Sequence, residues 1–130
     1  MEADARRLEL ERTRMAEDLR GVVAGDVIFD DAGRSLYATD ASLFRLPPLG
    51  VVRPRSVEDV AATLEWAARN GVPVHPRGGG TGLAGDALGS GIILDCSRYL
   101  RRIVGTAEET VRVQPGVTCR QLEAHLATFG

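Results

Sequence analysis

The stretch that decides the fold reads VPVHPRGGGTGLAGDALGSGIILDC and covers residues 72–96. Its first six residues have the pattern of a β-strand, and the three adjacent aliphatic residues Ile92 to Leu94 predict a second strand that is buried on both faces. Between them, five of the ten residues from Pro76 to Gly85 are glycine. The sequence therefore predicts a strand, a glycine-rich loop and a second strand in direct succession.

The glycine-rich loop matches GxGxxG at Gly80, Gly82 and Gly85, but its context differs from that of a nicotinamide-type Rossmann fold. That motif needs a helix that begins at the loop and an acidic residue about 20 positions further on. Here only DALGS separates Gly85 from the next strand, and Asp95 comes too early. A Walker-type loop is disfavoured as well, because no GK[ST] sequence follows.

The remaining reading is a loop that binds an anion with its own amides. A flexible linker is disfavoured, since two patterned strands flank the loop and the aliphatic Leu83 lies inside it. Consecutive glycines can turn several N–H groups to one side, and each charge-assisted hydrogen bond contributes about 1.5–3 kcal/mol. Thr81 adds a hydroxyl group. Arg77 adds either a positive charge or a surface ion pair.

A βαβ unit leads into this loop. GVVRP at residues 50–54 predicts a strand, and Ser56 with Asp59 forms a capping box for a helix that ends at Asn70 and Gly71. The two strands joined by this helix are expected to run parallel. Trp66 is expected on the helix face opposite to the sheet. The expected core face is made up of Val57, Val60, Ala61, Leu64, Ala67 and Ala68.

The remaining segments are simpler. Residues 2–20 predict a surface helix that ends at Gly21, with a thin apolar stripe at Leu8, Met15 and Leu19, and residues 22–50 are interpreted as irregular. Residues 101–116 predict a hairpin with its turn near residues 107–109. Thr118 and Gln121 form a second capping box, which opens a helix expected to run to Phe129 and Gly130. No closing strand follows, so the chain is expected to be the amino-terminal piece of a larger protein.

The composition excludes several classes of function. The chain has 130 residues, of which 44% are hydrophobic and 26% charged, with a net charge of -2. This balance gives no general attraction to nucleic acid, and no apolar run approaches the roughly 20 residues of a transmembrane segment. Cys96 and Cys119 stand alone, so neither a metal site nor a disulfide framework is expected. His75 and His125 are expected to have structural roles.

The order of four motifs, VVRPRSVEDV, PRGGGTGLAG, ILDCSR and VQPGV, resembles the FAD-binding domain of the vanillyl-alcohol oxidase and p-cresol methylhydroxylase (PCMH) superfamily. The likeness is strongest to FAD-linked D-2-hydroxyacid dehydrogenases, which act on D-lactate, glycolate or D-2-hydroxyglutarate. The resemblance implies an α+β, PCMH-type fold whose first subdomain has a βαβ unit and a mixed sheet and is incomplete here. It divides the chain into an N-terminal helix with a lead-in segment, residues 1–36, and part of the FAD-binding domain, residues 37–130.

The resemblance also assigns the cofactor site. It implies pyrophosphate contacts from the loop, mostly through backbone amides, and non-covalent FAD, because Thr81 stands where relatives with covalent flavin have histidine. The implied loop contacts are Arg77, Gly78, Gly79, Gly80, Thr81 and Gly82. Leu83 and Gly85 are implied to shape the loop, and Pro54 and Pro76 to lie near the adenine end. No catalytic residue is assigned. A 4Fe-4S cluster is an option only for a C-terminal domain outside this sequence.

The function implied is oxidation of a D-2-hydroxy acid by hydride transfer to flavin. Electrons would pass on to a quinone, a cytochrome or an iron–sulfur carrier. Two alternatives stay open: a non-catalytic fragment that depends on a partner, and the same fold in a sugar or alcohol oxidase. The start of the sequence, MEADARRLEL, lacks the apolar core of a signal peptide, so the expected location is the cytoplasm or the inner face of the cytoplasmic membrane.

Overall fold

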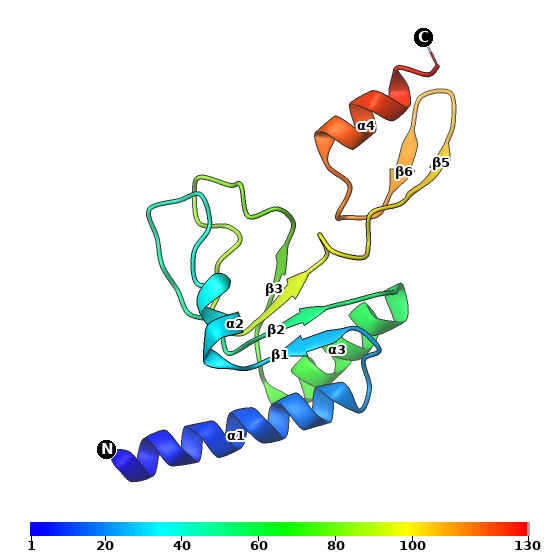
Figure 1. Cartoon of the computed structure of the whole chain (residues 1–130). Helices are drawn as coiled ribbons and strands as arrows, with labels where there is room; N and C mark the ends of the chain where they lie inside the picture. Colours follow the sequence, from blue (N-terminus) through cyan, green and yellow to red (C-terminus); the bar gives the residue numbers. More distant parts are fainter. Residues whose placement is uncertain (130) are drawn as a thin grey trace.

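The computed structural model describes residues 1–129 and has one main sheet with a small second sheet beyond it (Figure 1). The elements in chain order are α1 (Glu2–Arg20), β1 (Asp26–Ile28), α2 (Asp31–Leu36), β2 (Gly50–Arg53), α3 (Val57–Asn70), β3 (Val74–Arg77), β4 (Ile92–Asp95), β5 (Ile103–Thr106), β6 (Val111–Val113) and α4 (Cys119–Leu126). Among the helices of residues 1–129, none is both long and apolar enough to span a bilayer.

The main sheet has the strand order β1-β2-β4-β3. β2 and β3 both run parallel to β4, which confirms the parallel βαβ unit and places β4 between the two strands that α3 connects. β1 pairs antiparallel with β2, so the sheet is mixed and the predicted α+β class is confirmed. The prediction that residues 22–50 are irregular is wrong at β1 and α2, because a strand of three residues and a helix of six are too short to give a periodic signal.

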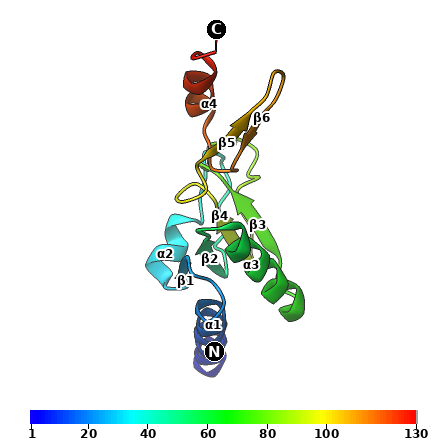
Figure 2. The same ribbon diagram turned by 90° about the vertical axis from the view of Figure 1, so that its right-hand side faces the viewer.

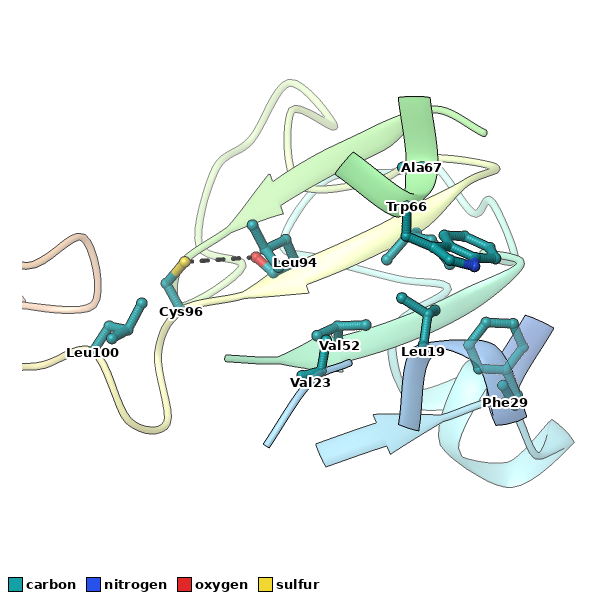
Figure 3. Packing of buried hydrophobic residues seen from close by; sticks show 11 residues of the cluster. Leu19, Val23, Phe29, Val52, Trp66, Ala67, Leu94, Cys96 and Leu100 are labelled. Carbon is teal, nitrogen blue, oxygen red and sulfur yellow. Dashed lines mark hydrogen bonds between the residues drawn. The ribbon is translucent and has the colours of Figure 1, made fainter. Parts of the chain in front are cut away.

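The two faces of the sheet are covered differently. The larger core lies on the face covered by α1 and α3, where Leu19, Val52, Trp66 and Leu94 pack together (Figure 3). The smaller core contains Tyr37, Val51 and Ile93 on the opposite face, where α2 lies. β4 is buried along its whole length, as predicted for a strand covered on both faces.

α3 buries a different face from the one predicted. Its N-cap Ser56 and the left-handed Gly71 at its end are as expected, but Trp66 is only 8% exposed and Val57 is 70% exposed. The buried face of α3 also holds two polar residues, Asp59 and Thr63, and both have hydrogen-bond partners. Thr63 donates to the carbonyl of Asp59, and the Asp59 carboxylate accepts the amides of Ala24 and Arg55 instead of completing a capping box.

The carboxyl-terminal part forms a unit that extends away from the main sheet in both views (Figures 1 and 2). β5 and β6 form the predicted hairpin, and the capping box of Thr118 and Gln121 is present at the start of α4. α4 ends at Leu126 and not at Phe129 as predicted; Gly130 lies outside the described residues. The stripe of α1 is confirmed at Leu19, which is fully buried, whereas Leu8 is 55% exposed.

Candidate functional site

The glycine-rich loop begins at the carboxyl ends of three parallel strands. Because β2, β3 and β4 are parallel, their last residues Arg53, Arg77 and Asp95 lie side by side at the same end of the sheet. Ligands of open α/β sheets bind outside the carboxyl ends of such strands. The sheet thus directs the loop to the place where a ligand site is expected.

The loop encloses a solvent-open pocket of about 270 Å³. Seven of the predicted cofactor-binding residues line it together with two others. The lining residues are Pro76, Arg77, Gly78, Gly79, Gly80, Thr81, Gly82, Asp86 and Ala87. No helix intervenes between β3 and β4 within the described residues, so the loop differs from a Rossmann loop as the sequence indicated.

The backbone of the loop suits an anion. Among the hydrogen bonds within residues 1–129, none is donated by an amide from Gly78 to Ala84, so these N–H groups are free to bind a ligand. Gly80 has a left-handed φ of 67°, and a Cβ added at Gly78 would meet nothing within 4 Å. A row of unused amides beside open space is what a diphosphate group requires. The residues present therefore fit the pyrophosphate of FAD.

Three predicted site residues lie outside this pocket. Leu83 is 80% exposed, and Pro54 is fully buried after the end of β2. Gly85 lines a neighbouring hollow together with Phe44, and its φ of 83° keeps the loop turned toward that side chain. The roles of Pro54 and Pro76 at an adenine group stay predictions.

The charges around the pocket are mixed. Arg77 is positive, whereas Asp86 is exposed and carries a negative charge in the pocket wall. Asp40 lies nearby, and hydrogen bonds from the side chain and backbone of Ser42 hold the pKa of its carboxyl group below the usual value. Anion binding in this pocket must therefore depend on the backbone amides of the glycine-rich loop more than on the net charge of the side chains around it.

A second loop, residues 38–46, packs against the glycine-rich loop. It is closed on itself by a bridge between Thr39 and Arg45 and by a 2.9 Å hydrogen bond from the Leu46 amide to the Ala38 carbonyl. The Ala41 amide donates to the Gly80 carbonyl at 3.0 Å and so joins the two loops. Sequence reasoning did not predict this contact, although the Asp40–Ser42 spacing is typical of an ordered Asx turn.

Arg77 points from the end of β3 toward the 38–46 loop. Its Nη1 donates to the Thr39 carbonyl at 3.0 Å, and its guanidinium carbon lies 5.2 Å from the centroid of the Tyr37 ring. A Cβ added at Gly80 would lie 2.5 Å from Nη2 of Arg77. A side chain at position 80 would therefore force the guanidinium group to move from this place.

Tyr37, which lies beside Arg77, is the centre of a buried polar network. Its hydroxyl donates to Oδ2 of Asp95 at 2.5 Å and accepts from Nε of Arg53 at 2.8 Å, while Oδ1 of Asp95 accepts the Ser97 amide. Burial, followed by the hydrogen bond to Asp95, raises the pKa of Tyr37 above its ordinary value. This network was missed because its members are far apart in the sequence and follow no motif.

The remaining reactive side chains form no further cluster in the described part of the chain. Nε2 of His125 lies 2.8 Å from Oγ1 of Thr106, and the ring of His75 lies where a Cβ at Gly89 would be. Burial raises the pKa of the Cys96 thiol, and both Cys96 and the exposed Cys119 are free cysteines. Within residues 1–129, no group of three or more His, Cys, Asp or Glu residues could hold a metal ion.

Comparison with known proteins identifies relatives of this chain. A family described as "FAD binding domain" matches residues 48–130. D-2-hydroxyglutarate dehydrogenase of Escherichia coli K12 is 43% identical over 111 residues, which are 82% of this chain and 11% of that protein. Glycolate oxidase subunit GlcD of the same strain is 37% identical over 114 residues, which are 84% of this chain and 23% of that protein.

The fold is shared with solved structures. p-Cresol methylhydroxylase with substrate bound has a TM-score of 0.68 and 17% identity, and the match covers 90% of this chain and 24% of that one. At this identity the likeness shows the fold alone. The resemblance to the PCMH-type superfamily is confirmed, and so is the predicted fold as a partial domain. The chain spans about a tenth of the length of the D-2-hydroxyglutarate dehydrogenases that it matches.

Proposed function

The chain belongs to the family of FAD-binding domains, and from this premise we propose that its glycine-rich loop holds the pyrophosphate of FAD. The free amides from Gly78 to Ala84 support this proposal most directly, because they are donors that no other group of the described chain uses. Three or four such bonds, each about 1.5–3 kcal/mol, are enough to anchor a nucleotide cofactor. The flavin is held without a covalent bond, since Thr81 offers no ring nitrogen for attachment.

The whole protein is proposed to be an FAD-linked oxidoreductase that oxidises a D-2-hydroxy acid. The identities of 43% and 37% to a D-2-hydroxyglutarate dehydrogenase and a glycolate oxidase subunit support this substrate class. Bound FAD supplies the acceptor for the hydride of the substrate. The part played by the present residues is to bind and orient the cofactor through the pocket, while the acid and base that act on the substrate belong to other parts of the protein.

The electron acceptor, a quinone, cytochrome or iron–sulfur carrier, and a cytoplasmic location are proposals of the same kind. So is a 4Fe-4S cluster in a domain outside this sequence. Reduction of the purified protein by substrate, followed by addition of each class of acceptor, would identify the one that reoxidises it. Cell fractionation would test the location.

The central experiment is a cofactor titration of the complete protein. The holoprotein is expected to show a flavin absorption spectrum, and acid precipitation is expected to release all of the FAD into the supernatant. A colourless protein that does not bind added FAD would refute the proposed cofactor. Flavin that stays with the precipitate would refute the non-covalent mode. D-2-hydroxyglutarate, D-lactate and glycolate should then be compared as reductants of the bound flavin, with a sugar and an aromatic alcohol testing the alternative oxidases.

A non-catalytic fragment is the second candidate. β1 and β3 form the two edges of the main sheet, and apolar side chains such as Leu43 and Leu83 are exposed, which favours association with further protein. Hydrogen exchange of the isolated 130-residue chain would test this candidate. Strong protection of the β4 amides in isolation would contradict dependence on a partner.

A further inference from the structure

Both left-handed glycines of the glycine-rich loop lie against the 38–46 loop. The glycines with positive φ between β3 and β4 are Gly80 and Gly85. Gly80 accepts a hydrogen bond from Ala41 and lies under the guanidinium of Arg77, and a Cβ at Gly85 would lie 3.0 Å from the Phe44 ring. The two left-handed glycines are therefore in contact with the 38–46 loop, which precedes β2, and with Arg77 at the end of β3.

Arg77 is engaged on that same side. It donates to the Thr39 carbonyl and stacks on the ring of Tyr37, whose hydroxyl is fixed by Asp95 and Arg53. A guanidinium group can donate in its plane while its flat face contacts a ring, whereas an ammonium group has no flat face. The contact therefore favours arginine over lysine.

We propose that Arg77, Tyr37 and the 38–46 loop are positioning residues that hold the glycine-rich loop in its anion-binding conformation. This inference rests on the proposed function and assigns Arg77 a different task from direct phosphate binding. Arg77 joins β3 to the 38–46 loop, and the Ala41 amide binds the Gly80 carbonyl, so neither contact uses the amides of residues 78–84. The pyrophosphate is bound by the backbone, and the arginine keeps that backbone in place.

The test compares Arg77→Lys with Arg77→Gln in the complete protein. If Arg77 acts by position, both variants lose FAD affinity to a similar degree, with the Kd raised about tenfold or more. If Arg77 acts by charge, the lysine variant keeps an affinity close to that of the unmodified protein. That second result would overturn the proposal.

A matched pair of tyrosine variants separates positioning from general stability. Tyr37→Leu removes the ring under Arg77 and is expected to behave like Arg77→Gln. Tyr99→Leu removes a ring that lies under Arg55 instead, and it is expected to keep FAD affinity within about threefold. Equal FAD affinity in these two tyrosine variants would contradict a role for the Tyr37 ring.

Hydrogen exchange without FAD gives the readout that does not depend on the cofactor. The amide of Ala41 is bonded to Gly80, so its exchange is expected to become about tenfold faster in Arg77→Lys and Tyr37→Leu and to stay unchanged in Tyr99→Leu. Unchanged protection of Ala41 in Arg77→Lys would overturn the proposal. If the protein bound no FAD at all, the proposed function would fail, whereas faster exchange at Ala41 would still support the positioning contact.

Discussion

The hydroxyl of Tyr37 donates a 2.5 Å hydrogen bond to Oδ2 of Asp95, which lies 58 residues later in the chain. Tyr37 precedes the whole βαβ unit, and Asp95 is the last residue of β4. The bond therefore ties the segment between β1 and β2 to an inner strand of the sheet. It also fixes the ring on which Arg77 stacks.

Tyr37→Phe is expected to destabilise the fold by about 1–3 kcal/mol, because it leaves a buried carboxylate oxygen of Asp95 and the Nε of Arg53 without their partner. Urea denaturation at neutral pH measures the loss. Tyr99→Phe is the matched control, since the Tyr99 hydroxyl bonds the partly buried Asp26 at 3.0 Å and its loss should cost less. Equal losses for the two variants would contradict the assigned burial of the Tyr37 network.

Alkaline pH is expected to weaken the fold through Tyr37. The folded pKa of this tyrosine is raised above its ordinary value of 10.0, mainly by burial, so the neutral phenol is favoured in the folded state. Its contribution to stability is fully present below about pH 10 and is lost as pH rises through the folded pKa. Urea denaturation between pH 8 and pH 11 should show this loss.

Tyr37→Phe should remove the part of the alkaline loss of stability that comes from ionisation of the tyrosine. Burial also raises the pKa of Cys96 above 9.0, so ionisation of this thiol also lowers the stability of the fold, beginning at a lower pH. The comparison is therefore made in a Cys96→Ala background, with and without Tyr37→Phe. A pH profile that does not change when Tyr37 is replaced would contradict the prediction.

Gly80→Ala is expected to weaken both folding and FAD binding. Its left-handed φ of 67° costs a residue with a Cβ about 1–2 kcal/mol, and the new methyl group would displace Arg77. Gly78→Ala is the control, because its Cβ would enter open space and its φ is not positive. Thermal denaturation and FAD titration of both variants check the difference. Similar behaviour of the two would argue against the described loop conformation.

Asp86→Asn is expected to tighten FAD binding. Asp86 is the acidic residue in the wall of the pocket, so its replacement removes a repulsion from the diphosphate. The effect at an exposed site is about 0.2–1 kcal/mol, or up to roughly fivefold in Kd, and should shrink as salt is added. Glu123→Gln on α4 is a control that should not alter the affinity. Weaker binding by Asp86→Asn would show that the carboxylate accepts a hydrogen bond that the site needs.

Local signals in the sequence predicted the elements around the glycine-rich loop. Ser56, Gly71 and the pair of Thr118 and Gln121 end or begin helices through contacts with residues a few positions away, and each was found where the sequence placed it. The aliphatic run of β4 was equally informative, because a strand covered on both faces needs no polar residue. Such features depend on near neighbours, and sequence patterns record near neighbours well.

Features that depend on distant partners were not predictable in this way. Trp66 lies in the core because Asp59 and Thr63 satisfy their polar groups within and beside the helix, and periodicity alone assigns such residues to the surface. The contact of Arg77 with Thr39 joins residues 38 positions apart. The five glycines among residues 76–85 were enough to identify the candidate site. Only the fold shows which side chains contact this loop.

The strand order has a consequence for how the chain is made. β4 is the inner strand between β2 and β3, yet it comes after both in the sequence. During synthesis from the amino terminus, β1, β2 and α3 leave the ribosome while the place beside β2 is still vacant. The sheet can close only when residues 92–95 have emerged, and until then the unpaired edge of β2 is open to other chains. Chaperone dependence of the nascent protein should therefore end near the emergence of β4.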